Sequence, residues 1–172
     1  MAHNAALSLI AAIVVSLSVL PTAFAGPAFA RASPSDIDQY LSAHNAIRAQ
    51  KGAVNLVWDD TLASYAQQVA NTCVFKHSGG PYGENLAAGT GSGFDIAAAI
   101  KSWTDEESEY DPNNPQPSHY TQVVWKATTH LGCGVQSCDG IFDPSYGKAN
   151  YYVCEYNPAG NVIGEFGENV EP

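Results

Sequence analysis

Residues 119–125 read HYTQVVW, and the structure assigned to this stretch decides the fold. Its β-branched residues favour a strand, whereas Ser118, directly after Pro117, is well placed to cap a helix. The patterns on either side are clearer, with helices and a short strand before it and two strands after it. This order of elements predicts an α+β layered domain.

The elements around this stretch follow from hydrophobic spacing and turn residues. Helices are expected over residues 37–51, 60–73 and 95–103, where apolar side chains recur at three- and four-residue steps. Strands are expected over residues 84–87, 131–136 and 151–156. The proline-rich residues 111–117 predict a surface loop. His44 lies on the inner face of the first helix, where a lone histidine is more often a hydrogen-bonded core residue than a ligand.

The N-terminus has the pattern of a secretory signal peptide. Residues 1–25 contain no Asp, Glu, Lys or Arg, and Ala23-Phe24-Ala25 before Gly26 fits the small-residue rule for cleavage. An uncleaved anchor helix is the alternative, but the apolar run from residue 5 to 20 is shorter than the roughly 20 residues that span a bilayer. We therefore expect a secreted, extracellular protein with a mobile arm at residues 26–35 and a single domain at residues 36–172.

Charge and cysteine content narrow the partners and the redox state. The net charge of −10 disfavours nucleic acids and anionic membrane surfaces, and we expect no stable membrane insertion after cleavage. The four cysteines form an even set, typical of two disulfides in a secreted chain. They are Cys73, Cys133, Cys138 and Cys154, and their number leaves three connectivities open.

Four polar residues stand in unusual settings, namely His77, Glu84, Glu106 and His119. They are 7, 22 and 13 positions apart, and no HExxH or CxxC motif accompanies them. Spacing alone therefore makes a weak metal site, and two solvated carboxylates with two ordinary histidines explain it equally well.

Four motifs in order change this interpretation. They are HSGGPYGENL (77–86), WTDE (103–106), HYTQVVW (119–125) and YVCEYNPAGN (152–161). Together they resemble the cysteine-rich secretory, antigen 5 and pathogenesis-related class one (CAP) superfamily, and the resemblance covers residues 38–166. It is greatest to the fungal branch, which includes sterol-exporting members. The resemblance implies a three-layer α-β-α sandwich, stapled by disulfides, with a cleft in which two histidines face two glutamates.

The resemblance also assigns roles to individual residues. His77 and His119 would face a divalent metal ion, zinc with magnesium as the alternative, while Glu84 and Glu106 would accept hydrogen bonds from water or metal. Cys73 would pair with Cys138, and Cys133 with Cys154. In sterol-exporting relatives an aromatic loop is the proposed lipid contact, and Tyr110 and Tyr120 match it here. Glu155 departs from the family pattern and is expected to add negative charge beside Cys154 without threatening the fold.

Three classes of function follow. The favoured class is a non-enzymatic protein that binds sterol or fatty acid and acts in lipid export or host defence. A secreted signalling or effector ligand for a host receptor or other protein partner is the first alternative. A metal-dependent hydrolase is the second. Among enzyme mechanisms it is the one left, because Ser78 and Ser118 lack a third group to orient their histidines and paired cysteines provide no thiolate.

Overall fold

Residues 119–124 form a helix, α4 (His119–Val124). The Ser118 side chain accepts a hydrogen bond from the backbone N–H of Thr121, and the Thr121 side chain bonds back to the backbone of Ser118. All five residues from Tyr120 to Val124 are buried. Because β-branched residues are poor helix formers, the cap and the surrounding core hold this segment helical.

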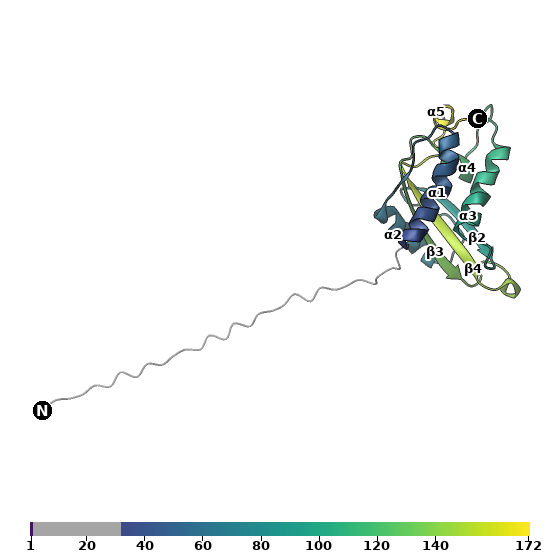
Figure 1. The fold of residues 1–172 in the computed structure, drawn as a ribbon. Coiled ribbons are helices and arrows are strands. Elements are labelled where there is room, and N and C mark those ends of the chain that lie inside the picture. Colours follow the sequence, from purple (N-terminus) through teal and green to yellow (C-terminus); the bar gives the residue numbers. More distant parts are fainter. Residues whose placement is uncertain (2–31) are drawn as a thin grey trace.

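The structure, a computed structural model, describes Met1 and residues 32–172 (Figure 1). The predicted signal peptide and residues 26–31 of the predicted arm lie outside the described residues. The first helix, α1 (Pro34–Gln50), starts inside the stretch expected to be an arm, so Pro34 and Ser35 are helical. In the described part of the chain, no helix has both the length and the apolar character needed to cross a bilayer.

The expected elements are all present, and the strands are longer than their patterns suggested. In chain order after α1 they are β1 (Val57–Trp58), α2 (Asp60–Asn71), β2 (Gly83–Thr90), α3 (Ile96–Thr104), η1 (Asp105–Glu109), α4, β3 (His130–Cys138), η2 (Pro144–Tyr146), β4 (Ala149–Asn157) and α5 (Phe166–Asn169). The short elements β1, η1, η2 and α5 were not expected, because two to five residues are too few to show a periodic pattern.

The sheet separates two helical layers. Its order is β1-β3-β4-β2, with β1 parallel to β3 and the other pairs antiparallel. Along β4, Tyr152, Cys154 and Tyr156 pack in one cluster with side chains of α1, α3 and α4. The alternate residues Tyr151 and Val153 pack in a second cluster with α2. This alternation confirms the three-layer α-β-α sandwich.

Helix α2 lies directly on the backbone of β3. A Cβ atom at Gly132 would come within 2.1 Å of the backbone nitrogen of Ala63, and one at Gly134 within 2.7 Å of the Gln67 backbone. Any larger residue at these positions would push the helix off the sheet. The side-chain amide of Gln67 makes two hydrogen bonds to the backbone of Val135: it donates to the carbonyl and accepts from the N–H. These bonds cover part of the unpaired edge of β3.

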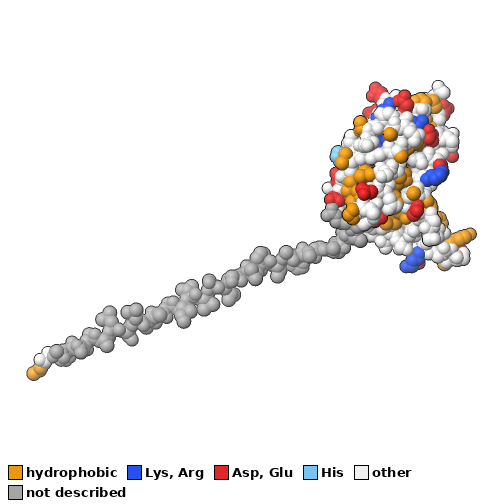
Figure 2. Space-filling model, in the orientation of Figure 1, with side chains coloured by type: hydrophobic (Ala, Val, Ile, Leu, Met, Phe, Trp, Pro, Cys, Tyr) orange, Lys and Arg blue, Asp and Glu red, His pale blue; other side chains and the backbone are white. Residues whose placement is uncertain are grey.

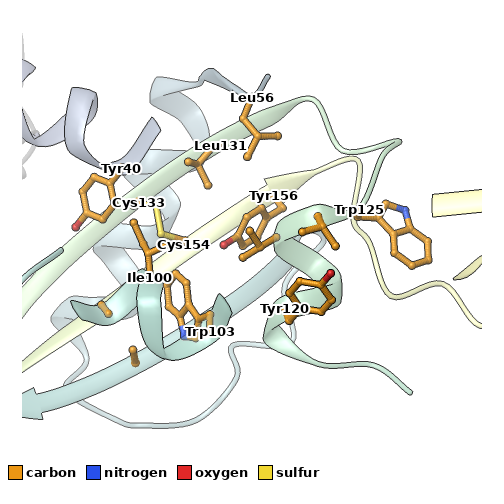
Figure 3. Packing of buried hydrophobic residues seen from close by; sticks show 14 of the residues in the cluster. Tyr40, Leu56, Ile100, Trp103, Tyr120, Trp125, Leu131, Cys133, Cys154 and Tyr156 are labelled. Atoms are coloured by element: carbon orange, nitrogen blue, oxygen red, sulfur yellow. A yellow bond between two sulfur atoms is a disulfide. The ribbon is translucent and has the colours of Figure 1, made fainter. Parts of the chain in front are cut away.

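Two disulfides join these layers, with the connectivity implied by the resemblance. Cys73, just after α2, is bonded to Cys138 at the end of β3, and Cys133 is bonded to Cys154, its direct partner on β4. Figure 3 shows the second disulfide among the aromatic side chains of the larger cluster. Both pairings are confirmed, and no cysteine is free.

The buried face of α1 includes His44, as its expected position on the inner face of the helix predicts. Its fully buried residues are Tyr40, His44 and Arg48, whereas Ile37 and Leu41 are only partly buried. His44 bonds the Tyr40 carbonyl through Nδ1 and the Tyr156 hydroxyl through Nε2, both at 2.8 Å. Burial lowers its pKa to about 4. His44 is therefore a neutral core residue, as expected for a lone histidine on an inner helix face.

Candidate functional site

The four predicted metal-site residues line one cleft of about 440 Å³. His77 lies in the loop between α2 and β2, Glu84 in β2, Glu106 in η1 and His119 at the start of α4. The fold therefore brings together residues that lie up to 42 positions apart in the sequence. The resemblance, rather than the spacing, predicted this grouping.

His77 and Glu84 form the first imidazole–carboxylate pair. Nδ1 of His77 lies 2.8 Å from Oε1 of Glu84, and the backbone N–H of Ser78 donates to the same oxygen at 2.9 Å. Burial acts to raise the pKa of Glu84, but hydrogen bonds from Ser78, His77 and Glu155 outweigh it, so this pKa is lowered. Glu84 is therefore ionised at neutral pH, while the His77 ring remains exposed.

Glu106 and His119 form the second pair, and here the carboxylate also binds the start of a helix. Oε1 of Glu106 lies 2.6 Å from Nδ1 of His119. Oε2 accepts from the backbone N–H groups of His119 and Tyr120 at 2.8 and 3.2 Å. Free N–H groups at a helix start favour a negative partner, so Glu106 fixes both the ring and the backbone of His119.

The geometry revises the expected role of the glutamates. Each bonds an imidazole rather than offering its oxygens freely to water or metal. Within residues 32–172, no three His, Cys, Asp or Glu side chains are placed to hold a metal ion together. In both histidines the contact to the carboxylate uses Nδ1 and leaves Nε2 for a ligand, which is the usual arrangement of a histidine bound to metal with a carboxylate behind it.

A second layer of contacts holds the His119 side of the cleft. The ring of Trp103 stacks on His119 with centroids 6.2 Å apart. The side-chain amide of Asn85 donates to the His119 carbonyl at 3.0 Å and to the Tyr156 hydroxyl at 3.2 Å. Since Tyr156 bonds His44, a continuous chain of hydrogen bonds links α1 to the cleft.

Asn161 also lines the cleft and was not singled out from the sequence. It has a φ of +59°, a conformation that Asn adopts more readily than most residues. Its side-chain oxygen accepts from Thr121 at 2.5 Å, and its amide donates to the Ser118 carbonyl at 3.0 Å. Asn161 therefore holds the start of α4 in place. Its position after Gly160 in the YVCEYNPAGN motif was the sequence feature that could have identified it as a site residue.

Glu155 is the third carboxyl group near the His77 side. It lies opposite Glu84 in the register of β2 and β4, and only 1% of its surface is exposed. Burial, together with the charge of Glu84 and a hydrogen bond with it, raises the pKa of Glu155 to about 9. The expectation that Glu155 adds negative charge does not hold at neutral pH, because a pKa of about 9 keeps this buried carboxyl group protonated there.

The two tyrosines proposed as lipid contacts differ in exposure. Their rings are 6.1 Å apart, but Tyr120 is completely buried, whereas Tyr110 is partly exposed and packs against the core. The prediction that Tyr120 contacts lipid is therefore corrected, because a ligand cannot reach this ring unless the structure opens locally. Tyr110 lies at the start of the loop of residues 110–118.

The hydroxyls next to the two histidines are engaged elsewhere. Ser78 Oγ accepts from the Gly80 N–H, and Ser118 Oγ caps α4. Both imidazoles bond carboxylates through Nδ1. The arrangement is therefore suited to holding a ligand or cation, and it does not place a serine against a histidine as serine catalysis requires.

A three-layer sandwich with two imidazole–carboxylate pairs at one end defines a class of small disulfide-linked domains. The chain belongs to the cysteine-rich secretory protein (CAP) family, which it matches over residues 41–156.

Two fungal relatives and one solved structure are similar to this chain over most of the domain. Protein PRY2 of Saccharomyces cerevisiae is 45% identical over 77% of this chain and 40% of its own length. Secreted protein RBT4 of Candida albicans is 44% identical over 73% of this chain and 36% of its own. The chain thus spans about two fifths of these relatives. The crystal structure of NaASP2 with Zn²⁺ has a TM-score of 0.62 and 28% identity, covering 77% of this chain and 84% of that one.

Proposed function

We propose that the protein is a secreted lipid-binding protein that takes up sterol or fatty acid and acts in lipid export or host defence. The main support for the proposal is the proline-rich loop of residues 110–118, which begins at the half-buried Tyr110 beside the cleft. The fungal branch that the sequence resembles includes sterol exporters, and in them the corresponding loop is the proposed contact.

The loop is only lightly fastened. Its internal bonds are all short-range. The N–H of Asn114 donates to the Asp111 carbonyl, the backbone and side chain of Asn113 donate to the Asp111 side chain, and the Gln116 side chain donates to that of Asn114. Both disulfides lie elsewhere. Displacing such a loop costs few contacts, and it would expose the apolar face of Tyr110 to a ligand.

The proposed extracellular location rests on the uncharged, apolar leader of residues 1–25. The similarity to a relative that is itself named a secreted protein supports it. Both disulfides also suit an oxidising compartment.

Replacing Tyr110 with alanine is expected to weaken lipid binding by about 1 to 3 kcal/mol, the usual range for losing a large buried apolar contact. Titration with labelled cholesterol and palmitate at micromolar protein measures it. The matched control is Tyr146→Ala, which removes an exposed tyrosine next to the β3–β4 hairpin. If the unaltered protein takes up neither lipid, the lipid-binding proposal fails and the receptor-ligand alternative becomes the better account.

We also propose that His77 and His119 together bind a divalent ion, zinc before magnesium. The residues fit this role because both rings line one cleft and each has a carboxylate on Nδ1. Imidazole nitrogen suits Zn²⁺ better than Mg²⁺. With two protein ligands, water would complete the coordination shell, so we expect moderate affinity.

Zinc binding is expected to be abolished by the double change His77→Ala and His119→Ala. In the unaltered protein it should weaken at acid pH, because protons compete with the metal ion for the ligand nitrogens. Isothermal titration with ZnCl₂ at pH 7.5 and pH 5 measures both effects. His130→Ala removes an exposed histidine outside the cleft and serves as the control. Unchanged affinity in the double variant would place the ion elsewhere.

A further inference from the structure

A second recess lies on the other side of the 110–118 loop. Pro117 and Ser118 line the polar cleft, whereas Pro115 faces a notch of about 230 Å³ whose other walls are Ile163, Gly164, Phe166 and Gly167. Figure 1 shows α5 and the C-terminus at the end of the molecule opposite the β3–β4 hairpin. The loop thus separates a polar recess from an apolar one.

The notch has a rigid floor and an open mouth. The Phe166 ring is buried and packs edge-on against Trp125, with centroids 5.2 Å apart. A Cβ atom at Gly164 or Gly167 would meet nothing within 4 Å, so the glycines leave the space open. Ile163 stands beside it with 77% of its surface exposed. The neighbouring Val162 is also exposed, so the apolar surface continues from the notch along this segment.

The charges around the notch select among apolar ligands. Glu165 and Glu168, both exposed, flank the lining residues Phe166 and Gly167 in the sequence. Lys126, whose backbone bonds α5 at Asn169, has its ammonium paired with Glu171. Figure 2 shows acidic side chains among the apolar ones at this end. With a net charge of −10 in addition, a carboxylate would be repelled here.

We infer that the notch between Pro115 and Phe166 binds one end of a neutral apolar lipid, such as a sterol or a fatty alcohol, and discriminates against fatty-acid anions. The inference rests on the proposed lipid-binding function and deepens it by naming the class of lipid. The notch is smaller than the roughly 300 to 1,000 Å³ of a pocket that encloses a whole ligand. The remainder of the lipid lies across the exposed Ile163 and Val162.

The test fills the notch without disturbing the core. Gly167→Leu places a side chain in open space within α5, and its φ is negative, so the backbone accepts it. Gly93→Leu is the matched control, since Gly93 is equally open and outside the notch. Labelled cholesterol, hexadecanol and palmitate are titrated at pH 7.5; the last two share a chain and differ in head group.

The unaltered protein is expected to bind cholesterol and hexadecanol at least tenfold more tightly than palmitate. Gly167→Leu should weaken both neutral lipids at least tenfold, and Gly93→Leu should bind like the unaltered protein. Glu165→Gln with Glu168→Gln should strengthen palmitate binding and leave hexadecanol unchanged. If Gly167→Leu folds poorly, Ile163→Ser replaces it as the test. This change at an exposed position should also weaken the binding of both neutral lipids.

The outcomes separate this inference from the proposed function. If the unaltered protein binds lipid but Gly167→Leu and Ile163→Ser bind it equally well, the notch is not the site and the lipid-binding function stands. If palmitate binds as tightly as hexadecanol, the selection for neutral lipids is wrong. If no lipid binds to the unaltered protein, both the inference and the proposed function fail.

Discussion

Arg48→Met is expected to lower the free energy of unfolding by about 3 to 5 kcal/mol, because it leaves several buried carbonyl acceptors without a donor. The guanidinium of Arg48 is completely buried and donates to four carbonyls at 2.7 to 2.9 Å, those of Val54, Val123, Trp125 and Thr128. Methionine fills similar space and leaves all four acceptors without their donor. A buried acceptor left unpaired costs about 1 to 3 kcal/mol.

The loss is large because domains of this size are stable by only about 5 to 15 kcal/mol. Arg48→Lys should have an intermediate effect, because a single ammonium cannot reach carbonyls in four directions. Urea unfolding followed by tryptophan fluorescence measures both variants. Gln50→Met, an exposed position on the same helix, is the control. A loss below 1 kcal/mol for Arg48→Met would contradict the bonding described here.

Glu155→Gln is expected to stabilise the protein by about 3 kcal/mol at pH 7, and by more at pH 8.5. The pKa of Glu155 rises from 4.5 to about 9 on folding, so the folded state holds a proton that the unfolded state releases. Its contribution is therefore fully present below pH 4.5 and is lost as the pH rises to about 9. At pH 7 the difference of about 2.5 units corresponds to about 3 kcal/mol.

Glutamine removes this titration and keeps nearly the same side-chain shape. Urea unfolding at pH 4.5, 7 and 8.5 should give curves for the two proteins that converge at acid pH and separate as the pH rises. Glu168→Gln, an exposed acid, should parallel the unaltered protein throughout. Parallel pH curves for Glu155→Gln would mean that Glu155 is ionised in the folded protein.

The sequence predicted the layered fold because its long elements carry clear periods. It could not decide residues 119–125, since Val123 and Val124 favour a strand while the Ser118 cap favours a helix, and only burial on all sides settles the question. It placed His44 on the inner face of α1, but it did not indicate that Arg48 is more deeply buried than Ile37 and Leu41. Periodicity counts apolar residues and misses polar ones that find buried partners.

The candidate site was predicted as a group but not in its internal bonding. His77, Glu84, Glu106 and His119 do share a cleft. The pairing of each histidine through Nδ1, the hydrogen bonds from Asn161 to α4 and the position of Glu155 opposite Glu84 depend on register and burial. No local pattern encodes those quantities. Tyr120 was mistaken for a contact residue for the same reason, because sequence does not separate a buried ring from an exposed one.

The glycine contacts between α2 and β3 have a consequence for how a ligand travels. The backbones of α2 and β3 are in direct contact at Gly132 and Gly134, so these two layers leave no space between them for a ligand. A lipid bound beside the 110–118 loop, as proposed, would instead keep one side in contact with water. An open site of this kind would allow fast binding and release, which suits the proposed role in lipid export better than long-term storage of lipid.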